Sequence, residues 1–251
     1  MQIRDIGLSV LKGGRHTVPS RVLLEASGPA GDRLFAVIDL DAGRVLRTVE
    51  NPLLVSCEAR WDGEVLAVDI GGHAVSATPK QNGDALTLEY WEREVSMSVV
   101  DGPWAREFSR LLGRDVALAQ IDTPGGVVYG DTVTIVTTSS LHRVAEESGI
   151  AIDARRFRAT FTIDTGDAAA YVEDAWAGHE IEMGSARLLV GVGIPRCAVI
   201  DSDPDTGARG TKLLKTLARS RLTGQDIPFG VYAQVIQPGL VSRGDSVMLL
   251  A

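Results

Sequence analysis

The chain has 251 residues, of which 45 % are hydrophobic and 23 % are charged, as in an ordinary soluble protein of one or two domains. This composition excludes a disordered, collagen-like or coiled-coil protein as the main architecture. The formal net charge is −8, and basic clusters are few, which argues against a nucleic-acid partner. A few local Arg and Lys side chains could still hold a small anion.

The sequence contains no membrane or secretion signal of the usual kinds. No apolar run approaches the roughly 20 residues of a membrane helix, and the N-terminal residues include the acidic Asp5 and no signal-peptide core. We therefore expect a cytoplasmic protein without a membrane partner. In that compartment the two cysteines, Cys57 and Cys197, are poor evidence for a disulfide, and no Cys–His spacing suits zinc.

Short β-rich runs separated by turn residues dominate residues 1–95. Asp, Asn and Gly gather between these runs, as they do in tight turns. This half is therefore predicted to be an all-β unit, a small barrel or sandwich. The runs expected to form strands are 1–10, 21–25, 34–40, 53–60, 64–70 and 85–89.

Helices enter the pattern after residue 95. Apolar residues recur at helical spacing over 104–112, and Gly113 ends the helix that they predict. Two more helices are expected, at 140–147 and at 212–222, the latter with Thr211 as its N-cap. The strands expected in this half are 158–163, 186–192, 197–201, 230–235 and 246–250.

The change of periodicity suggests a boundary in the turn at 100–103. We expect two domains, residues 1–100 and 101–251. The predicted fold class is mainly β with a few helices, a β-rich α+β protein.

The segment most informative about chemistry is 195–207. It places Arg196 directly before Cys197, and a neighbouring cation favours the thiolate, the form of cysteine that attacks or binds a metal. The carboxylates of the following turn, Asp203-Pro-Asp-Thr-Gly207, can accept backbone N–H bonds and fix the loop. The local residues leave open that Cys197 is a small buried hydrophobe. Cys57 has no adjacent cation and is expected to be structural.

Two other segments have the chemistry to hold an anion. A strand starting in 153–158, Asp-Ala-Arg-Arg-Phe-Arg, would place Arg156 and Arg158 on one face, where two guanidiniums can clamp a phosphate or a carboxylate. Surface ion pairs with nearby aspartates are the alternative. The hydroxyls of 137–141 precede a predicted helix, where they could cap it or help to receive an anion.

Taken in order, these segments resemble the MOSC family, named for the C-terminal domain of molybdenum-cofactor sulfurase. The resemblance covers essentially the whole chain and implies an N-terminal MOSC β-barrel-like domain followed by a MOSC β-barrel domain. The segments that carry it are Gly31-Asp-Arg33, Asn51-Pro-Leu53, Phe157-Arg158, Trp176-Ala-Gly178, Arg196-Cys197, Asp203-Pro-Asp-Thr-Gly207 and Phe229-Gly-Val-Tyr232.

Within that family the chain is similar to the amidoxime-reducing component enzymes. This similarity implies a molybdenum cofactor, Mo-molybdopterin, with Cys197 as the metal ligand and the catalytic residue. The residues that it implies in cofactor binding are Lys12, Arg33, Ser140 with Ser139 as a register alternative, Arg158, Thr160 and Arg196.

Three departures from the family pattern bear on this similarity. The chain has Phe157-Arg-Ala-Thr160 where the family usually has Phe-Arg-Pro-Asn, which removes an amide. It has Lys12-Gly13 in place of Lys-Ser, which removes a hydroxyl. Since the chain carries no C-terminal Cys-rich iron–sulfur domain, electrons are expected from a separate donor protein, a reductase of ferredoxin-like or cytochrome b5-like type.

The sequence thus predicts a molybdenum-dependent oxidoreductase that reduces small N-hydroxylated (N-oxygenated) substrates. Two alternatives stay open. In the first, the protein is a sulfur carrier with a persulfide on Cys197. In the second, it is a module that binds the molybdenum cofactor without catalysis.

Overall fold

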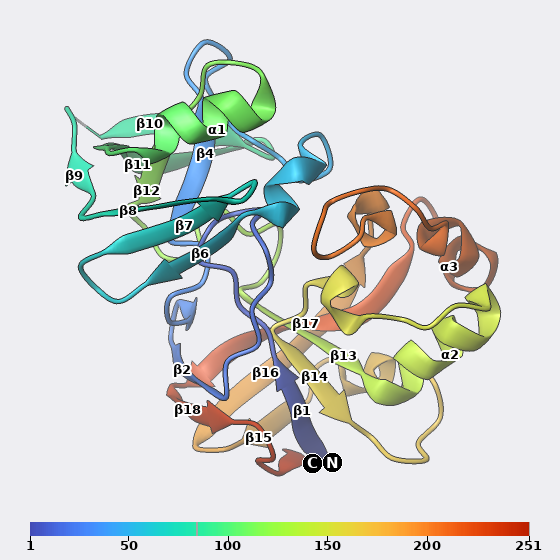
Figure 1. Cartoon of the computed structure of the whole chain (residues 1–251). Coiled ribbons are helices and arrows are strands. Elements are labelled where there is room, and N and C mark those ends of the chain that lie inside the picture. Colours follow the sequence, from blue (N-terminus) through green and yellow to red (C-terminus); the bar gives the residue numbers. More distant parts are fainter. Residues whose placement is uncertain (84, 251) are drawn as a thin grey trace.

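The computed structural model describes residues 1–83 and 85–250, and it is built mainly of β-strands with three α-helices among the described residues. Two β-rich bodies lie one above the other in Figure 1, with most of the N-terminal half in the upper body. The β-rich class with barrel-like sheets, predicted from the sequence, is confirmed. In the described part of the chain, no helix has the length and apolar character needed to cross a membrane.

The lower body is a barrel of seven strands in the order β1, β14, β13, β17, β16, β15, β19. A bridge between Gln2 and Ser246 joins β1 to the segment before β19 and closes the sheet on itself. The strands are β1 (Gln2–Ile6), β13 (Val133–Thr137), β14 (Phe161–Asp164), β15 (Glu180–Met183), β16 (Ala186–Pro195), β17 (Pro228–Gln237) and β19 (Val247–Leu249).

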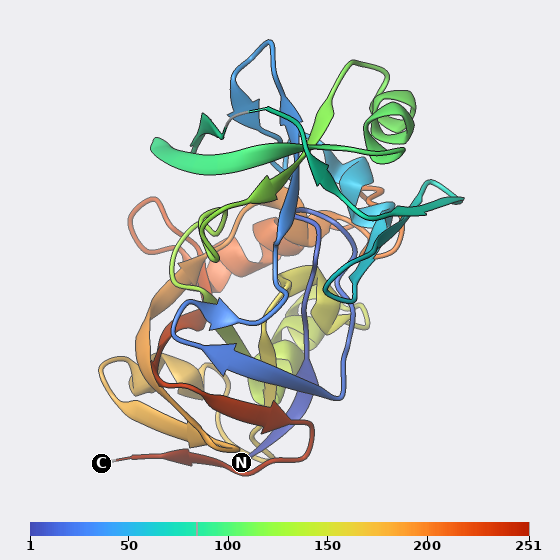
Figure 2. The ribbon, with the colours of Figure 1, turned by 90° about the vertical axis from the view of Figure 1, so that its left-hand side faces the viewer.

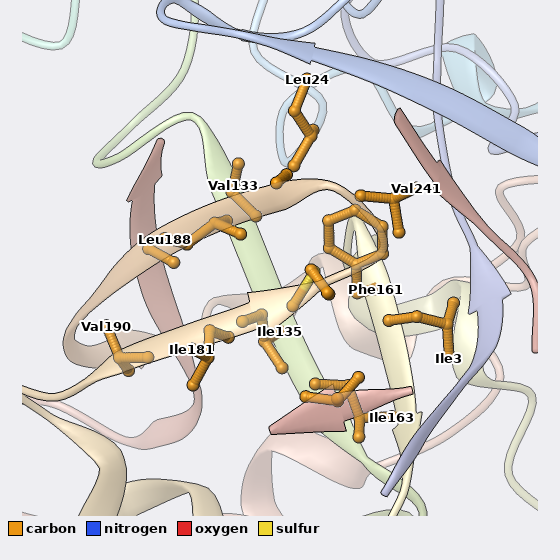
Figure 3. Close-up of a cluster of buried hydrophobic side chains, with 14 of the residues drawn as sticks. Ile3, Leu24, Val133, Ile135, Phe161, Ile163, Ile181, Leu188, Val190 and Val241 are labelled. Atoms are coloured by element: carbon orange, nitrogen blue, oxygen red, sulfur yellow. The ribbon is translucent and has the colours of Figure 1, made fainter. Parts of the chain in front are cut away.

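A small sheet completes this barrel. It consists of β2 (Arg21–Glu25), β3 (Gly28–Pro29) and β18 (Gly239–Ser242), and Figure 2 shows β2 beside β18. Leu24 and Val241 of this sheet pack into the same buried cluster as Ile3, Ile135 and Phe161 of the barrel (Figure 3). Burial of this cluster is the main stabilising contribution to the lower body.

The upper body contains a six-stranded sheet in the order β10, β5, β4, β12, β11, β9, in which β10 also pairs with β11 and so closes five of the strands. A separate meander, β6–β7–β8, packs beside it (Figure 1). The strands are β4 (Phe35–Asp39), β5 (Arg44–Val45), β6 (Glu58–Trp61), β7 (Leu66–Ile70), β8 (His73–Ala77), β9 (Lys80–Gln81), β10 (Leu86–Tyr90), β11 (Arg93–Asp101) and β12 (Ala117–Ile121).

Each half of the sequence contributes strands to the body that the other half mainly forms. β1 pairs with β14, and β2 pairs with β18, so two N-terminal strands belong to the lower body. β12 pairs with β4 and β11 in the upper body. The division of the sequence into domains 1–100 and 101–251 stays a prediction, and the two bodies are tied together by these exchanged strands.

The helices follow the apolar periodicity closely. They are α1 (Trp104–Leu112), α2 (Thr138–Ser148) and α3 (Leu213–Arg221). Gly113 ends α1 in the left-handed conformation, as predicted. The predicted N-cap of α3 is wrong, because Lys212 occupies that position and Thr211 instead donates its hydroxyl to the Asp201 carbonyl at 3.2 Å.

Three predicted strands are replaced wholly or at their start by short 3-10 helices. These are η1 (Pro52–Ser56), η2 (Ala154–Phe157) and η4 (Ala198–Asp201). Pro52 favours a helical start because its ring fixes φ and the missing N–H needs no partner there. Asp153 caps η2 by accepting a hydrogen bond from the Arg155 N–H at 2.9 Å.

Candidate functional site

A groove between the two bodies collects most of the residues singled out in the sequence. Lys12 and Arg33 reach it from the N-terminal half, and Arg158, Arg196 and Cys197 reach it from the C-terminal half. A second, adjoining part of the groove shares Lys12, Arg196 and Cys197 with the first. Cys197 therefore lies where the two parts meet.

Backbone pairing explains how such distant residues meet. The Gly7 N–H donates to the Thr160 carbonyl at 2.8 Å, so the segment after β1 starts at the lower body beside Arg158. That segment then runs to the upper body, where the Lys12 N–H donates to the Phe35 carbonyl at 2.7 Å. The crossing segment thus places the Lys12 side chain at the mouth of the lower barrel.

Two of the groove arginines have a backbone that side chains rarely adopt. Arg33 has φ 52° and Arg158 has φ 51°, both in the left-handed region. Arg158 takes this conformation where it ends the 3-10 helix η2, so it does not begin a strand. Non-glycine residues held in this region cluster at functional sites, where the surrounding structure holds the strain.

The Asp153–Arg158 segment does not form the predicted two-arginine strand face. Arg155 instead makes a bidentate ion pair with the Asp205 carboxylate, at 2.8 and 3.0 Å. Arg156 lines the groove but donates to the Ser202 carbonyl at 2.6 Å. These two arginines hold η2 against the turn after Cys197. Arg158 faces the groove, and its Nη2 has no hydrogen-bond partner in the part of the chain that the structure describes.

The groove holds more buried positive charge than negative charge. Burial, with a contribution from Arg33 and Arg158, lowers the pKa of Lys12 to about 7. Burial and the nearby Arg33 lower the pKa of Arg158 to about 9. Arg33 is paired with Asp32, whereas Nη2 of Arg158 is buried with no hydrogen-bond partner among the described residues. Such a cluster is complementary to an anionic ligand.

Arg196 supports the loop that carries Cys197. Its Nε donates to the Phe229 carbonyl at 2.8 Å and its Nη1 to the Phe157 carbonyl at 2.7 Å, and the two aromatic rings are stacked at 4.4 Å between centroids. Nη2 of the same guanidinium is buried without a partner within the described part of the chain. Burial also lowers the pKa of Arg196 to about 10. Arg196 therefore adds a further uncompensated donor beside Cys197.

The two cysteines have opposite surroundings. Cys197 is exposed, so it is not the small buried hydrophobe that the local sequence left open. Cys57 is fully buried in the core of the upper body, and this burial raises the pKa of its thiol to about 11. A reactive role fits Cys197 and a packing role fits Cys57.

The turn after Cys197 joins the two bodies. Asp203 Oδ1 accepts hydrogen bonds from the Asp205 N–H at 3.1 Å and the Thr206 N–H at 2.9 Å, as predicted for this motif. Gly207, at φ 75°, lies so close to the Pro52 carbonyl that a Cβ atom would collide with it. This turn therefore fixes the position of the Cys197 loop relative to the upper body.

Three of the predicted cofactor contacts do not line the groove. Ser139 is bonded to Thr165, and Ser140 donates to Glu173 Oε2 at 2.8 Å. Thr160 and Thr134 exchange backbone-to-hydroxyl hydrogen bonds of 2.9 and 3.1 Å. Their polar groups are used within the protein, so we no longer place Ser139, Ser140 and Thr160 among the residues that would touch a ligand.

Several groove residues were not singled out from the sequence. Tyr90 lies under the Lys12 ammonium, with 5.3 Å from Nζ to the ring centroid, and Tyr232 lies on β17 of the lower body. The second, adjoining part of the groove also contains Arg47, Trp91 and Tyr129. The one sequence signal that could have pointed to this part of the groove is Trp91-Glu92, which stands in a hairpin turn where Asn-Gly is usual.

Comparison with known proteins assigns the family. The model of the MOSC domain matches residues 109–248, more than half of the chain. The protein therefore belongs to the MOSC domain family. No curated protein matches the chain at a significant level.

Solved structures with a related fold include the YuaD protein of Bacillus subtilis, with 12 % identity, a TM-score of 0.48, and coverage of 98 % of this chain and 93 % of that one. YiiM of Geobacillus stearothermophilus is 18 % identical, with a TM-score of 0.35 and coverage of 48 % and 54 %. YiiM of Escherichia coli is 15 % identical, with the same TM-score of 0.35 and the same coverage of 48 % and 54 %.

Proposed function

We propose that this MOSC protein binds the molybdenum cofactor in the groove and reduces N-hydroxylated compounds. The observation that carries the proposal is the set of buried cations, Lys12, Arg33, Arg158 and Arg196, gathered around an exposed thiol. Among residues 1–83 and 85–250, the one carboxylate paired with a member of this set is Asp32, which bonds Arg33. An anionic cofactor would supply the missing negative charge.

The residues present fit this group. The orphaned Nη2 atoms of Arg158 and Arg196 are suited to bind the cofactor phosphate and polar edge, with Lys12 and Arg33 beside them. Cys197 supplies a soft thiolate ligand for the metal. In residues 1–83 and 85–250, no group of three or more His, Cys, Asp or Glu side chains could hold a metal by itself. The other metal ligands would therefore belong to the cofactor.

When bound, the cofactor supplies two-electron redox chemistry at its metal. The overall reaction combines an N-hydroxylated compound with two electrons and two protons to give the reduced nitrogen compound and water. The electrons would come from a separate donor protein. Cys197 anchors the metal, and Arg196 holds the Cys197 loop against Phe157 and Phe229.

Metal and phosphate analysis tests this proposal. We expect about one molybdenum and organic phosphate per chain in protein from a cofactor-competent host. We expect Cys197→Ser to abolish N-reductive turnover and to change the metal spectrum, while the thermal stability stays near wild type because the site is exposed. Turnover retained by Cys197→Ser, or absence of molybdenum from the wild type, would reject the assignment.

Sulfur transfer is a second candidate, favoured by the exposure of the Cys197 thiol. In that case Cys197 would carry a persulfide, and mass spectrometry would find one additional sulfur atom on Cys197 in protein without molybdenum. Bound molybdenum cofactor without turnover would instead identify a non-catalytic binding module.

A further inference from the structure

The groove has two chemically different ends, and Cys197 lies between them. We call the first part of the groove, which is lined by Arg33, Arg156 and Arg158, the inner end. The adjoining part, which has Arg47 and Trp91 in their place, is the outer end. The cationic inner end suits the cofactor anion. The outer end offers aromatic surface and one additional guanidinium, which the cofactor contacts above do not use.

The aromatic surface at the outer end is built and partly open. Trp91 and Tyr129 form an edge-to-face pair with 5.1 Å between ring centroids, although they come from different segments of the chain. Tyr129 is 56 % exposed, which leaves ring surface free to contact a ligand. Edge-to-face pairs hold their rings in a defined orientation, so this pair presents a preformed wall for a planar group.

Trp91 is held there in a strained turn. β10 and β11 are joined by the two residues Trp91 and Glu92, which have φ 51° and 61°. This type of turn usually takes Asn-Gly, and a bulky residue at positive φ is a conformational outlier. Strain of this kind is found where the position of a side chain is used.

Arg47 adds charge to the same wall. Its guanidinium lies over the Trp91 ring, 4.5 Å from the centroid. Its contacts with the Glu50 and Glu89 carboxylates are long, 3.8 and 3.9 Å, and its side chain makes no hydrogen bond among the described residues. Asp226 also lines this end, but Lys12, Arg47 and Arg196 outnumber it. A guanidinium on an aromatic wall that has only these two long ion contacts and no hydrogen bond suits a carboxylate on a planar ring.

We propose that the outer end, formed by Arg47, Trp91 and Tyr129, is a substrate subsite for planar aromatic compounds that bear a carboxylate. The ring would pack against Trp91 and Tyr129, the carboxylate would bind Arg47, and the reacting nitrogen would point toward Cys197. The assignment as a substrate subsite rests on the proposed function, whereas binding of the aromatic acid does not depend on a bound cofactor.

Titration calorimetry with 2-naphthoate on the full chain tests the subsite. We expect saturable binding that Trp91→Asn, which keeps a turn-compatible residue, and Arg47→Gln each weaken about tenfold, close to 1.4 kcal/mol. The matched control Arg60→Gln, on an arginine whose side chain is 78 % exposed in β6, should bind as the wild type does. Cyclohexanecarboxylate should bind more weakly than 2-naphthoate.

Three results would overturn the subsite. They are equal affinity in the wild type and both groove variants, displacement of 2-naphthoate by inorganic phosphate, which would place it at the inner end, and no saturable binding to the wild type. Metal analysis is independent of this experiment. A protein that lacks molybdenum but binds 2-naphthoate as expected would reject the proposed function and leave the binding site standing.

Discussion

Two buried polar clusters of this protein differ in how their polar groups are satisfied. In the groove cluster of Lys12, Arg158 and Arg196, the Nη2 atoms of both arginines have no hydrogen-bond partner among the described residues. The helix cluster of Thr137, Ser140 and Glu173, at the start of α2, is joined by hydrogen bonds of 2.7 and 2.8 Å to the Glu173 carboxylate. Thr137 ends β13, Ser140 lies in α2 and Glu173 lies in the 3-10 helix η3 (Val172–Trp176). Among the described residues, the atom left over in the helix cluster is an acceptor, Glu173 Oε1, whereas the groove cluster has donors left over for a ligand.

The comparison separates a binding role from a stabilising one. Buried polar groups are normally paired, because an unpaired group loses its hydration without replacement. Sequence reasoning treated Ser140 and Arg158 alike as cofactor contacts. The structure separates them by the partners that each side chain has found within the chain, Glu173 for Ser140 and none for the Arg158 Nη2.

The largest effect on stability is expected at Glu173. Replacing it by Ala leaves the Thr137 and Ser140 hydroxyls buried without their acceptor, so Glu173→Ala should lower the free energy of unfolding by about 3 kcal/mol. Glu173→Gln keeps an acceptor oxygen and should cost clearly less. Urea unfolding measures both variants, and a loss below about 1 kcal/mol for Ala would show that the helix cluster is not stabilising.

Arg158 should show the opposite behaviour. Arg158→Met removes a buried cation without a partner, so the ligand-free protein should be as stable as the wild type or more stable. Affinity for the cofactor, or for inorganic phosphate as a probe, should fall about thirtyfold, close to 2 kcal/mol. Arg158→Lys should also bind more weakly because the bidentate fork is lost. Phosphate titrations that do not distinguish the three proteins would refute the anion clamp.

The two cysteines extend the comparison to packing. Cys57→Ser buries a hydroxyl in the core of the upper body and should cost about 1–2 kcal/mol of unfolding free energy. Cys197→Ser, at an exposed position, should cost almost nothing. Thermal melts of both variants without ligand measure the difference. Equal melting temperatures would mean that the Cys57 site tolerates a polar atom.

Lys12 should make the stability of the ligand-free protein depend on pH. Its pKa is lowered from 10.5 to about 7 by burial and by Arg33 and Arg158. Between these two values the unfolded chain binds more protons than the folded chain at this site, so the ligand-free protein gains stability as pH rises from 7 toward 10.5. The gain is at most about 1.4 kcal/mol per pH unit.

Lys12→Met removes this titrating group, so comparison of the variant with the wild type isolates its contribution. The difference in unfolding free energy between the variant and the wild type should be largest near pH 6 and should shrink as pH rises. A difference that does not change with pH would mean that Lys12 keeps its charge in the folded protein.

Much of the site was readable in the sequence because its signals are local. The Asp203 turn needs only neighbouring residues, and the structure keeps it. The adjacent residues Arg196 and Cys197 both line the groove. The helix over 104–112 and its end at Gly113 follow from apolar spacing and from the freedom of glycine to adopt positive φ.

The tertiary structure decided what depends on residues far apart in the chain. Glu173 accepts a hydrogen bond from Ser140, the segment after β1 brings Lys12 to the groove, and Trp91 packs against Tyr129 from a distant part of the chain. No periodicity or local motif encodes these meetings. Whether a buried polar side chain is free for a ligand depends on its folded neighbours, and that is the physical reason why the sequence could not distinguish the groove cations from hydroxyls that are already bonded within the protein.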